Sequence, residues 1–162
     1  MKHVPIGKSG FVATVDDDDF DRITAHKWTL SKAGSTFYAL TSIRLASGKH
    51  VTVYMHRMVM NYSGPLMIDH ANRDGLDNQR GNLRIATRGQ NSMNRGPKKS
   101  GISRFTGVSR QDGENRAKPW FATLARKRIG YFATEEEAAS ARDRAARAVY
   151  GDFIRLGDEG VQ

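Results

Sequence analysis

The segment NRGPKKSG at residues 94–101 divides the chain into two parts. Glycine and proline interrupt helices and strands, and this composition is typical of a linker between folded domains. A length of 162 residues suits one ordinary domain or two small ones. We therefore expect a first domain at 1–95, a basic linker at 96–103 and a second domain at 104–157.

The charge of the chain points to a polyanionic partner. Lysine and arginine number 26 against 17 aspartate and glutamate, and no acidic residue lies between Asn78 and Gln111. Nucleic acid is the polyanion we consider first, although basic proteins without a specific nucleic-acid partner are the alternative on charge alone.

The chain has no cysteine, which excludes disulfides, thiolate nucleophiles and cysteine-based zinc fingers. No apolar run is long enough to span a membrane.

Strand-length runs separated by turns are typical of the part before the linker. They lie at 11–15, 37–43 and 51–55, and residues 46–49 suit a hairpin turn between the last two. The acidic run at 16–19 could suggest a metal site. We favour the interpretation that these aspartates cap a short helix and complement its positive end.

The part after the linker predicts three strands and a helix. The strands are expected at 105–109, 120–124 and 129–132. Thr134 and Glu137 have the spacing of a capping box, in which each side chain satisfies an amide of the helix start.

The predicted helix continues to Gly151, which suits a left-handed C-terminal cap. Small residues at helical spacing are expected to lie on the sheet: Ala138, Ala141, Ala145 and Val149. We expect the helix arginines Arg142, Arg144 and Arg147 to face solvent.

The segment IDHANRDGLDNQRGNLRIAT at 68–87 contains the most informative side chains. Asp69 and His70 end a predicted strand, where neighbouring residues face opposite sides, so a bend is needed for both to serve one site. The Asp-, Asn- and Gly-rich loop turns the chain, and residues 83–85 can return as a second strand. A capping box at 87–90 then starts a helix that carries Asn91.

Asp69, His70 and Asn91 suit metal-assisted hydrolysis of a phosphodiester. Carboxylate and amide oxygens are ligands that Mg²⁺ accepts, and a neutral imidazole can take the proton of an attacking water. Ordinary turn chemistry is the alternative for an isolated Asp-His pair. The complete ordered set, beside an acid-free basic segment, favours the catalytic interpretation.

From Met55 to about Arg95 the chain resembles HNH endonucleases of the phage and intron-homing type, in the pieces MHRMVM, IDHANRDGLDNQRGNLRIAT and QNSMN. The resemblance implies a ββα-metal fold in which Asp69 and Asn91 hold one Mg²⁺ or Mn²⁺ ion per site. It also implies His70 as the general base and Asn82 as the residue that holds the loop together. Asn91 replaces the third histidine of the motif, which favours magnesium or manganese over zinc. The N-terminal block resembles the β-rich extension that precedes the motif in such proteins.

Residues 104–157 resemble the plant ethylene-response-factor (APETALA-class) DNA-binding domain. The matching pieces are TGV at 106–108, KPWFA at 118–122, IGYFAT at 129–134 and EEAA at 136–139. The resemblance implies a three-stranded antiparallel sheet that enters the major groove, with one helix packed behind it. The turn at 111–115 departs from the plant pattern, so base specificity is not implied. The DNA-facing positions would be Arg104, Arg110, Arg116, Lys118, Trp120, Arg126 and Arg128, with core packing as the alternative for Trp120.

Further candidate residues flank the nuclease motif. His56 either contacts a phosphate or assists the leaving group, or else it is a partly buried strand histidine. By proximity to the motif we expect phosphate contacts from Arg57, Arg73 and Arg80, with solvated charge as the alternative. Lys98 and Lys99 of the linker could follow a phosphate backbone.

The sequence thus predicts an α+β protein: a ββα-metal nuclease domain with a β-rich extension, plus a small sheet with one helix. The expected activity is metal-dependent nicking of double-stranded DNA, without a membrane or an organic cofactor. A monomer in the cytoplasm of a phage-infected or bacterial host cell is favoured. The alternatives are a non-catalytic sequence-specific DNA-binding regulator and a protein that cleaves or binds RNA.

Overall fold

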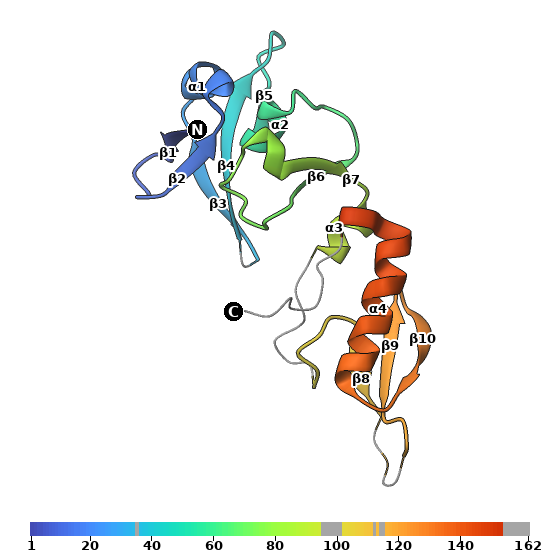
Figure 1. Cartoon of the computed structure of the whole chain (residues 1–162). Coiled ribbons are helices and arrows are strands. Elements are labelled where there is room, and N and C mark those ends of the chain that lie inside the picture. The colour runs from blue at the N-terminus through green and yellow to red at the C-terminus, as the bar shows by residue number, and fades with distance from the viewer. Residues whose placement is uncertain (35, 95–101, 112, 114–115, 154–162) are drawn as a thin grey trace. The chain divides into compact units, whose positions relative to one another are not determined.

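The computed structural model describes residues 1–34, 36–94, 102–111, 113 and 116–153 (Figure 1). The chain divides into two compact units, Met1–Arg88 and Gly89–Gln162. Unit 1 combines small antiparallel sheets with few helices, and the described part of unit 2 combines one antiparallel sheet with few helices, in line with the expected mixed class. Most of the predicted linker lies outside the described residues, and so do Lys98 and Lys99.

The first half of unit 1 is rich in strands. The first two strands pair with each other, and the next three form a meander in the order β3-β4-β5. The strands predicted at 11–15, 37–43 and 51–55 are confirmed as β2, β4 and β5 to within a few residues. Strands β1 and β3 were not predicted, because each is short and has few apolar residues. The elements are β1 (Lys2–Pro5), β2 (Val12–Val15), α1 (Asp17–Thr24), β3 (Thr29–Ala33), β4 (Thr36–Arg44) and β5 (His50–Tyr54).

The second half of unit 1 contains the informative segment. Strands β6 and β7 form an antiparallel pair in which Ile68 lies opposite Ile85. Met55, predicted as the end of a strand, instead starts a helix whose residues Met55 and Val59 are buried on one face. The elements are α2 (Met55–Val59), β6 (Met67–His70), the 3₁₀-helix η1 (Arg80–Asn82), β7 (Leu83–Ala86) and α3 (Arg88–Met93), which extends into unit 2.

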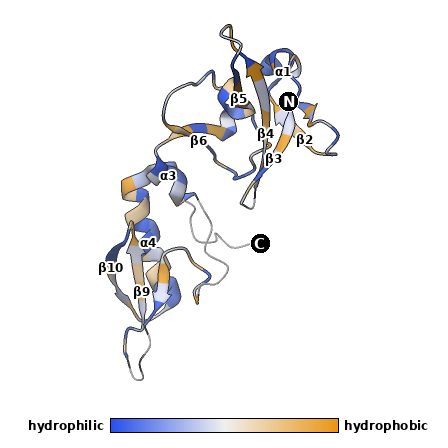
Figure 2. Cartoon of the chain, turned by 180° about the vertical axis from the view of Figure 1, so that it is seen from behind, coloured by the Kyte–Doolittle hydropathy of each residue, from blue (hydrophilic) through white to orange (hydrophobic). Residues whose placement is uncertain are grey.

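A single apolar core holds unit 1 together. Trp28 is 3% exposed, and its indole Nε1 donates to the carbonyl of Ile23 at 2.8 Å. Apolar residues occur in short pieces along the strands and helices (Figure 2), and no helix of the described part is long and apolar enough to cross a membrane. The buried core residues are Val4, Ile6, Ala13, Val15, Ile23, Trp28, Ala39, Met55, Val59, Ile68, Leu76 and Leu83.

Unit 2 contains a three-stranded antiparallel sheet with one long helix against it. The sheet has the order β10-β9-β8, formed by β8 (Val108–Arg110), β9 (Trp120–Leu124) and β10 (Lys127–Phe132). The first strand begins later than predicted because Gly107 has φ of +73°, where an added Cβ would lie 2.6 Å from the carbonyl oxygen of Thr123.

Helix α4 (Glu135–Tyr150) begins at the predicted capping box and ends before Gly151 as predicted, but Gly151 has ψ of −133° and does not form the predicted left-handed cap. The hydroxyl of Thr134 accepts from the amide of Glu137 at 3.1 Å, and the Glu137 carboxylate accepts from the amide of Ala133 at 3.0 Å. Gly151 has φ of +55° and starts the 3₁₀-helix η2 (Gly151–Phe153).

The buried face of α4 differs from the prediction. It is formed by Ala138, Ala139, Ala141, Arg142 and Ala146, whereas Val149 is 64% exposed. The prediction that Arg142 faces solvent was wrong, since this residue is 2% exposed. Its side chain passes close to Gly107, where the helix approaches the sheet, and its guanidinium pairs with Asp143 at 2.9 Å. The aliphatic part of an arginine can pack in this way.

Candidate functional site

Asp69 and His70 end β6, and both are 5% exposed. The hairpin register is continuous through them, with Asp69 opposite Arg84 and His70 opposite Leu83. The bend expected between the two residues is therefore not seen. The Asp69 carboxylate pairs with the Arg84 guanidinium, with Oδ2 at 2.8 Å from Nε and 2.7 Å from Nη2. The imidazole of His70 contacts the side chains of Asn78, His56 and Tyr38.

The imidazole of His70 lies against the side chain of Asn78. His70 Nε2 is 3.4 Å from Asn78 Oδ1, and Asn78 Nδ2 donates to the carbonyl of Leu76 at 3.1 Å. The second bond assigns the amide orientation, so that the oxygen faces the ring. His70 then donates from Nε2, and Nδ1 has the lone pair. Sequence reasoning missed Asn78, because nothing in a single sequence separates a fully buried asparagine from the other turn residues of this loop.

His56 from α2 lies beside His70. The two ring centroids are 5.2 Å apart and the planes meet at 81°. Tyr54 stacks on His56 with centroids 5.3 Å apart, and Tyr38 lies 5.7 Å from each histidine ring. The structure thus groups the buried His56 and His70 with two half-buried tyrosines, which the spacing of these residues in the sequence did not indicate.

Burial keeps both imidazoles neutral near neutral pH. It lowers the pKa of His56 to about 3, with smaller contributions from His70 and from Arg57. Burial also lowers the pKa of His70, while the hydrogen bond with Asn78 and the carboxylate of Asp69 act in the opposite direction. A neutral imidazole is the form that can accept a proton.

Asn82 makes several hydrogen bonds inside the loop that follows β6. Its Oδ1 accepts from the amide of Asn72 at 3.0 Å, and its Nδ2 donates to the carbonyl of Asp77 at 2.8 Å. The amide of Ala71 donates to the carbonyl of Asn82 at 2.9 Å. These bonds join the start of the loop to its end.

The predicted metal ligands belong to different units. Asp69 ends β6 in unit 1, whereas Asn91 lies on α3 in unit 2. Their joint binding of a metal stays a prediction. The described residues contain no group of three or more His, Cys, Asp or Glu side chains arranged to hold a metal ion. A carboxylate oxygen and an amide oxygen nevertheless fit the hard cations Mg²⁺ and Mn²⁺ better than zinc.

The three arginines predicted to contact phosphate have different environments. Arg57 donates to the carbonyls of Gly64 at 3.1 Å and Leu66 at 2.9 Å. Arg80 is paired with Asp19. Arg73 is exposed and lines an open groove together with residues that include Phe11 and Phe37.

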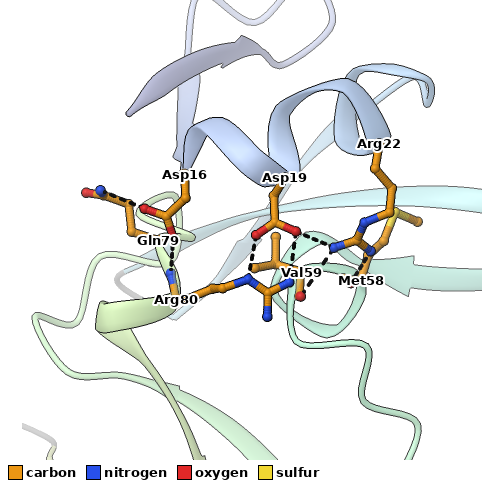
Figure 3. A network of polar contacts seen from close by, with 7 residues as sticks. All are labelled: Asp16, Asp19, Arg22, Met58, Val59, Gln79 and Arg80. Atoms are coloured by element: carbon orange, nitrogen blue, oxygen red, sulfur yellow. Dashed lines mark hydrogen bonds and ion pairs between the residues drawn. The ribbon is translucent and has the colours of Figure 1, made fainter.

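The acidic run forms a network that the sequence did not predict (Figure 3). Asp16 is at the N-cap of α1 but makes no capping bond with its side chain. Its carboxylate instead accepts from the amide of Arg80 at 2.7 Å. Asp19 is 2% exposed and pairs with Arg22 and Arg80. The predicted capping was therefore wrong for Asp16, while Asp17–Asp19 do occupy the first turn of α1 as expected.

The sheet of unit 2 has two different faces. Val108, Trp120 and Phe132 belong to the core under α4, which favours the core alternative for Trp120. Since neighbouring residues alternate along a strand, Phe121 and its partner Tyr131 lie on the opposite face. We call this the open face.

The open face has an arginine over its aromatic rings. The Arg128 guanidinium lies 4.7 Å from the ring centroid of Phe121 and 5.0 Å from that of Tyr131, and it also donates to the Tyr131 hydroxyl. Arg126 is in the two-residue turn before β10, where Ala125 and Arg126 have φ of +48° and +68°.

The other predicted DNA-facing residues of unit 2 are spread around the sheet. Arg104 pairs with Glu136 at 3.0 Å and Arg116 donates to Gln111 at 2.9 Å, while the Arg110 guanidinium lies 5.8 Å from the Trp120 ring centroid. Lys118 is exposed.

Comparison with known proteins identifies the family. The chain is 32% identical over 152 residues to an uncharacterized HNH endonuclease of Acanthamoeba polyphaga mimivirus, a match that covers 91% of this chain and 74% of the relative. No family model matches the chain, and no solved structure matches it. The strength and extent of the similarity to the viral protein show that the chain belongs to the HNH endonucleases.

Proposed function

We propose that this protein is a metal-dependent endonuclease that nicks double-stranded DNA, with His70 as the general base. The observation that carries the proposal is the environment of His70. Burial favours its neutral form, and the Asn78 amide orients the ring so that Nδ1 is the proton acceptor. Membership of the HNH endonucleases supports the same conclusion.

His70 would take a proton from the water that attacks the phosphorus atom. The proton would move to Nδ1 as the water oxygen forms its bond to phosphorus, the bond from phosphorus to the 3′ oxygen would break, and the 3′ oxygen would take its proton from solvent water. The products are a 5′ phosphate and a 3′ hydroxyl. One such site cuts one strand, so a single chain nicks the duplex.

Asp69 and Asn91 would hold the divalent cation. Arg84 anchors Oδ2 of the Asp69 carboxylate, which fixes the position of this side chain at the end of β6. When bound, Mg²⁺ or Mn²⁺ stabilises the negative charge on the departing 3′ oxygen.

His56 would contact a phosphate oxygen by a hydrogen bond. A pKa of about 3 leaves almost none of this imidazole protonated at neutral pH, so general acid catalysis by His56 is disfavoured. A neutral imidazole still has one N–H donor. Its position beside His70 supports a contact close to the reacting phosphate.

Unit 2 would bind DNA through the open face of its sheet. Arg128 supplies a cation, and Phe121 and Tyr131 supply aromatic surface beside it. The resemblance of 104–157 to the ethylene-response-factor domain supports the use of this sheet. Arginine can bind both guanine edges and phosphates, so this face could contribute affinity and sequence preference.

A non-catalytic DNA-binding regulator is the second candidate. The ion pair between Asp69 and Arg84 favours it, because the carboxylate that should bind a metal already has a cationic partner. Under this alternative the nuclease segment has only a structural role.

A supercoiled-plasmid assay separates the two candidates. With Mg²⁺ we expect conversion to the open-circular form, and EDTA should prevent it. Binding without any cleavage in Mg²⁺ or Mn²⁺ would favour the regulator. Equal or faster cleavage of an RNA duplex of the same sequence would contradict DNA as the substrate.

A further inference from the structure

A buried carboxylate of α1 connects two segments that are distant in the sequence (Figure 3). The Asp19 side chain is 3% exposed and accepts from Arg80 through two bonds, Nε to Oδ2 at 2.8 Å and Nη2 to Oδ1 at 2.9 Å. Arg22 also donates to Oδ1 of the same carboxylate, and its guanidinium reaches the carbonyls of Met58 and Val59 at the end of α2.

Two more contacts attach the N-terminal part to the same loop. Asp16 accepts from the amide of Arg80 at 2.7 Å and from Nε2 of Gln79 at 3.2 Å. The backbone of Thr14 accepts from the amide of Asn78 at 2.7 Å and donates to the carbonyl of Leu76 at 2.8 Å. The loop is therefore fixed at Leu76, Asn78 and Arg80 by β2 and α1.

These anchor points lie beside the residues that contact the proposed general base. Asn78, whose amide oxygen faces His70, is two positions before Arg80. Arg80 also starts η1, which ends at Asn82, and Asn82 bonds back to Ala71 directly after His70. A displacement of Arg80 would therefore be transmitted to both sides of His70.

We propose that Arg80 is a positioning residue, and that its ion pair with Asp19 holds the loop that orients His70. This inference rests on the proposed nuclease function and assigns Arg80 a role other than phosphate binding. The geometry supports it, because a bidentate pair with a buried carboxylate fixes the guanidinium in one place. Removing the arginine would also leave the Asp19 charge with one fewer partner in a buried site, which is unfavourable.

The test compares Arg80→Met with Arg22→Met in the full chain. Each substitution removes one cationic partner of Asp19, but only Arg80 belongs to the loop. We expect Arg80→Met to lower the single-turnover cleavage rate by about 10- to 100-fold, because small displacements of a catalytic group have effects of this size. Arg22→Met should lower the melting temperature but leave the cleavage rate within about twofold of wild type. Arg80→Lys should recover part of the rate, since it keeps the charge but not the two-pronged pair.

Salt dependence of DNA binding distinguishes positioning from phosphate contact. Loss of a phosphate contact would make the slope of log K against log salt shallower by about 0.9. For Arg80→Met we expect an unchanged slope and an unchanged dissociation constant. A shallower slope with weaker binding and a normal cleavage rate would overturn the proposal.

Amide hydrogen exchange measures the loop without reference to cleavage. Arg80→Met should speed exchange at Ala71, Asn72 and Asn78, whose amides are bonded within or to the loop, and Arg22→Met should not. Unchanged exchange and rate in Arg80→Met would overturn positioning while leaving the nuclease proposal intact. Equal rate losses in both variants would also overturn it, because the effect would then be general destabilisation.

If the wild-type chain cleaves no DNA, the nuclease proposal fails, and the role of Arg80 in orienting a general base fails with it. Faster loop exchange in Arg80→Met would in that case show only that Arg80 anchors the loop. If Arg80→Met does not fold, Arg80→Lys takes its place in the cleavage and exchange measurements, and a wild-type rate and wild-type exchange in that variant would contradict the proposal.

Discussion

The imidazole rings of His56 and His70 meet edge to face, with centroids 5.2 Å apart. One comes from α2 and the other from the end of β6, so the contact joins these two elements of unit 1. Neither ring can be protonated without placing a charge in a buried cluster beside another imidazole. The pair therefore couples the stability of unit 1 to pH.

Unit 1 should lose stability as the pH falls below 6.5. His56 has a pKa of about 3 in the folded protein and 6.5 as its ordinary value, so between these values only the unfolded chain binds the proton. Each pH unit in this window then costs at most about 1.4 kcal/mol from His56, and this stabilisation is fully present only above 6.5. Urea unfolding at a series of pH values measures the slope.

A matched variant attributes this slope to the histidine. His56→Phe keeps an aromatic ring in the cluster but cannot be protonated, so its unfolding free energy should depend less on pH in the same window. Asp19 affects the unfolding free energy only at lower pH. Burial raises the pKa of its carboxyl group, but hydrogen bonds from Arg80 and Arg22 outweigh this effect and hold the pKa below 3.8. The stability that Asp19 contributes is therefore lost only as the pH falls below 3.8. A slope identical in wild type and His56→Phe would contradict the assignment.

Asn78→Asp should shift the pH profile of cleavage upward. A carboxylate in place of the amide that faces His70 favours the imidazolium, so the pKa of His70 rises. Because the neutral form is the base, the acidic limb of the rate profile should move to higher pH. The profile of kcat/KM measures this shift, and Asn72→Asp is the control, since the side chain of Asn72 bonds to Asn82 and Asp77 within the loop. A larger shift in the control would count against the role of Asn78.

Arg128→Ala should weaken DNA binding, and Arg144→Ala should not. Both changes remove one positive charge from unit 2, but Arg128 is on the open face of the sheet, whereas Arg144 is on α4 and donates to Ser140 at 2.9 Å. If Arg128 contacts a phosphate, the salt slope of binding should become shallower by about 0.9 for Arg128→Ala alone. Fluorescence anisotropy with a labelled duplex at several salt concentrations measures it. Equal effects of the two changes would rule out a specific role for the open face.

Asp69→Ala should abolish cleavage, and added Mn²⁺ should restore little. The substitution removes one of the two proposed metal ligands and also deprives the Arg84 guanidinium of its carboxylate partner. Circular dichroism therefore has to show that the variant is folded. Asp69→Asn keeps the shape and tests the charge separately. Cleavage by a folded Asp69→Ala protein at the wild-type rate would refute the metal assignment.

The sequence predicted the local elements better than the contacts between them. The predicted start of α4 was correct because Thr134 and Glu137 interact within one turn of the helix. Such local hydrogen bonds depend only on the spacing of the two residues in the sequence. The stretch from β6 to α3 was also predicted closely, since its turn residues and short apolar runs are local signals.

Interactions between residues that are distant in the sequence could not be predicted from the sequence. The pair of Asp19 with Arg80 joins residues 61 positions apart, and the contact of His56 with His70 joins residues from α2 and from the end of β6. Arg142 illustrates the same limit, because its burial follows from the close approach of α4 to Gly107 rather than from its own polarity.

The most direct test of the central claim is single-turnover nicking of a supercoiled plasmid by wild type and by His70→Ala in Mg²⁺. The account predicts that His70→Ala loses nicking by about 100-fold or more while its dissociation constant for the same DNA stays close to the wild-type value. Nicking by His70→Ala at nearly the wild-type rate would contradict the assignment of His70 as the general base.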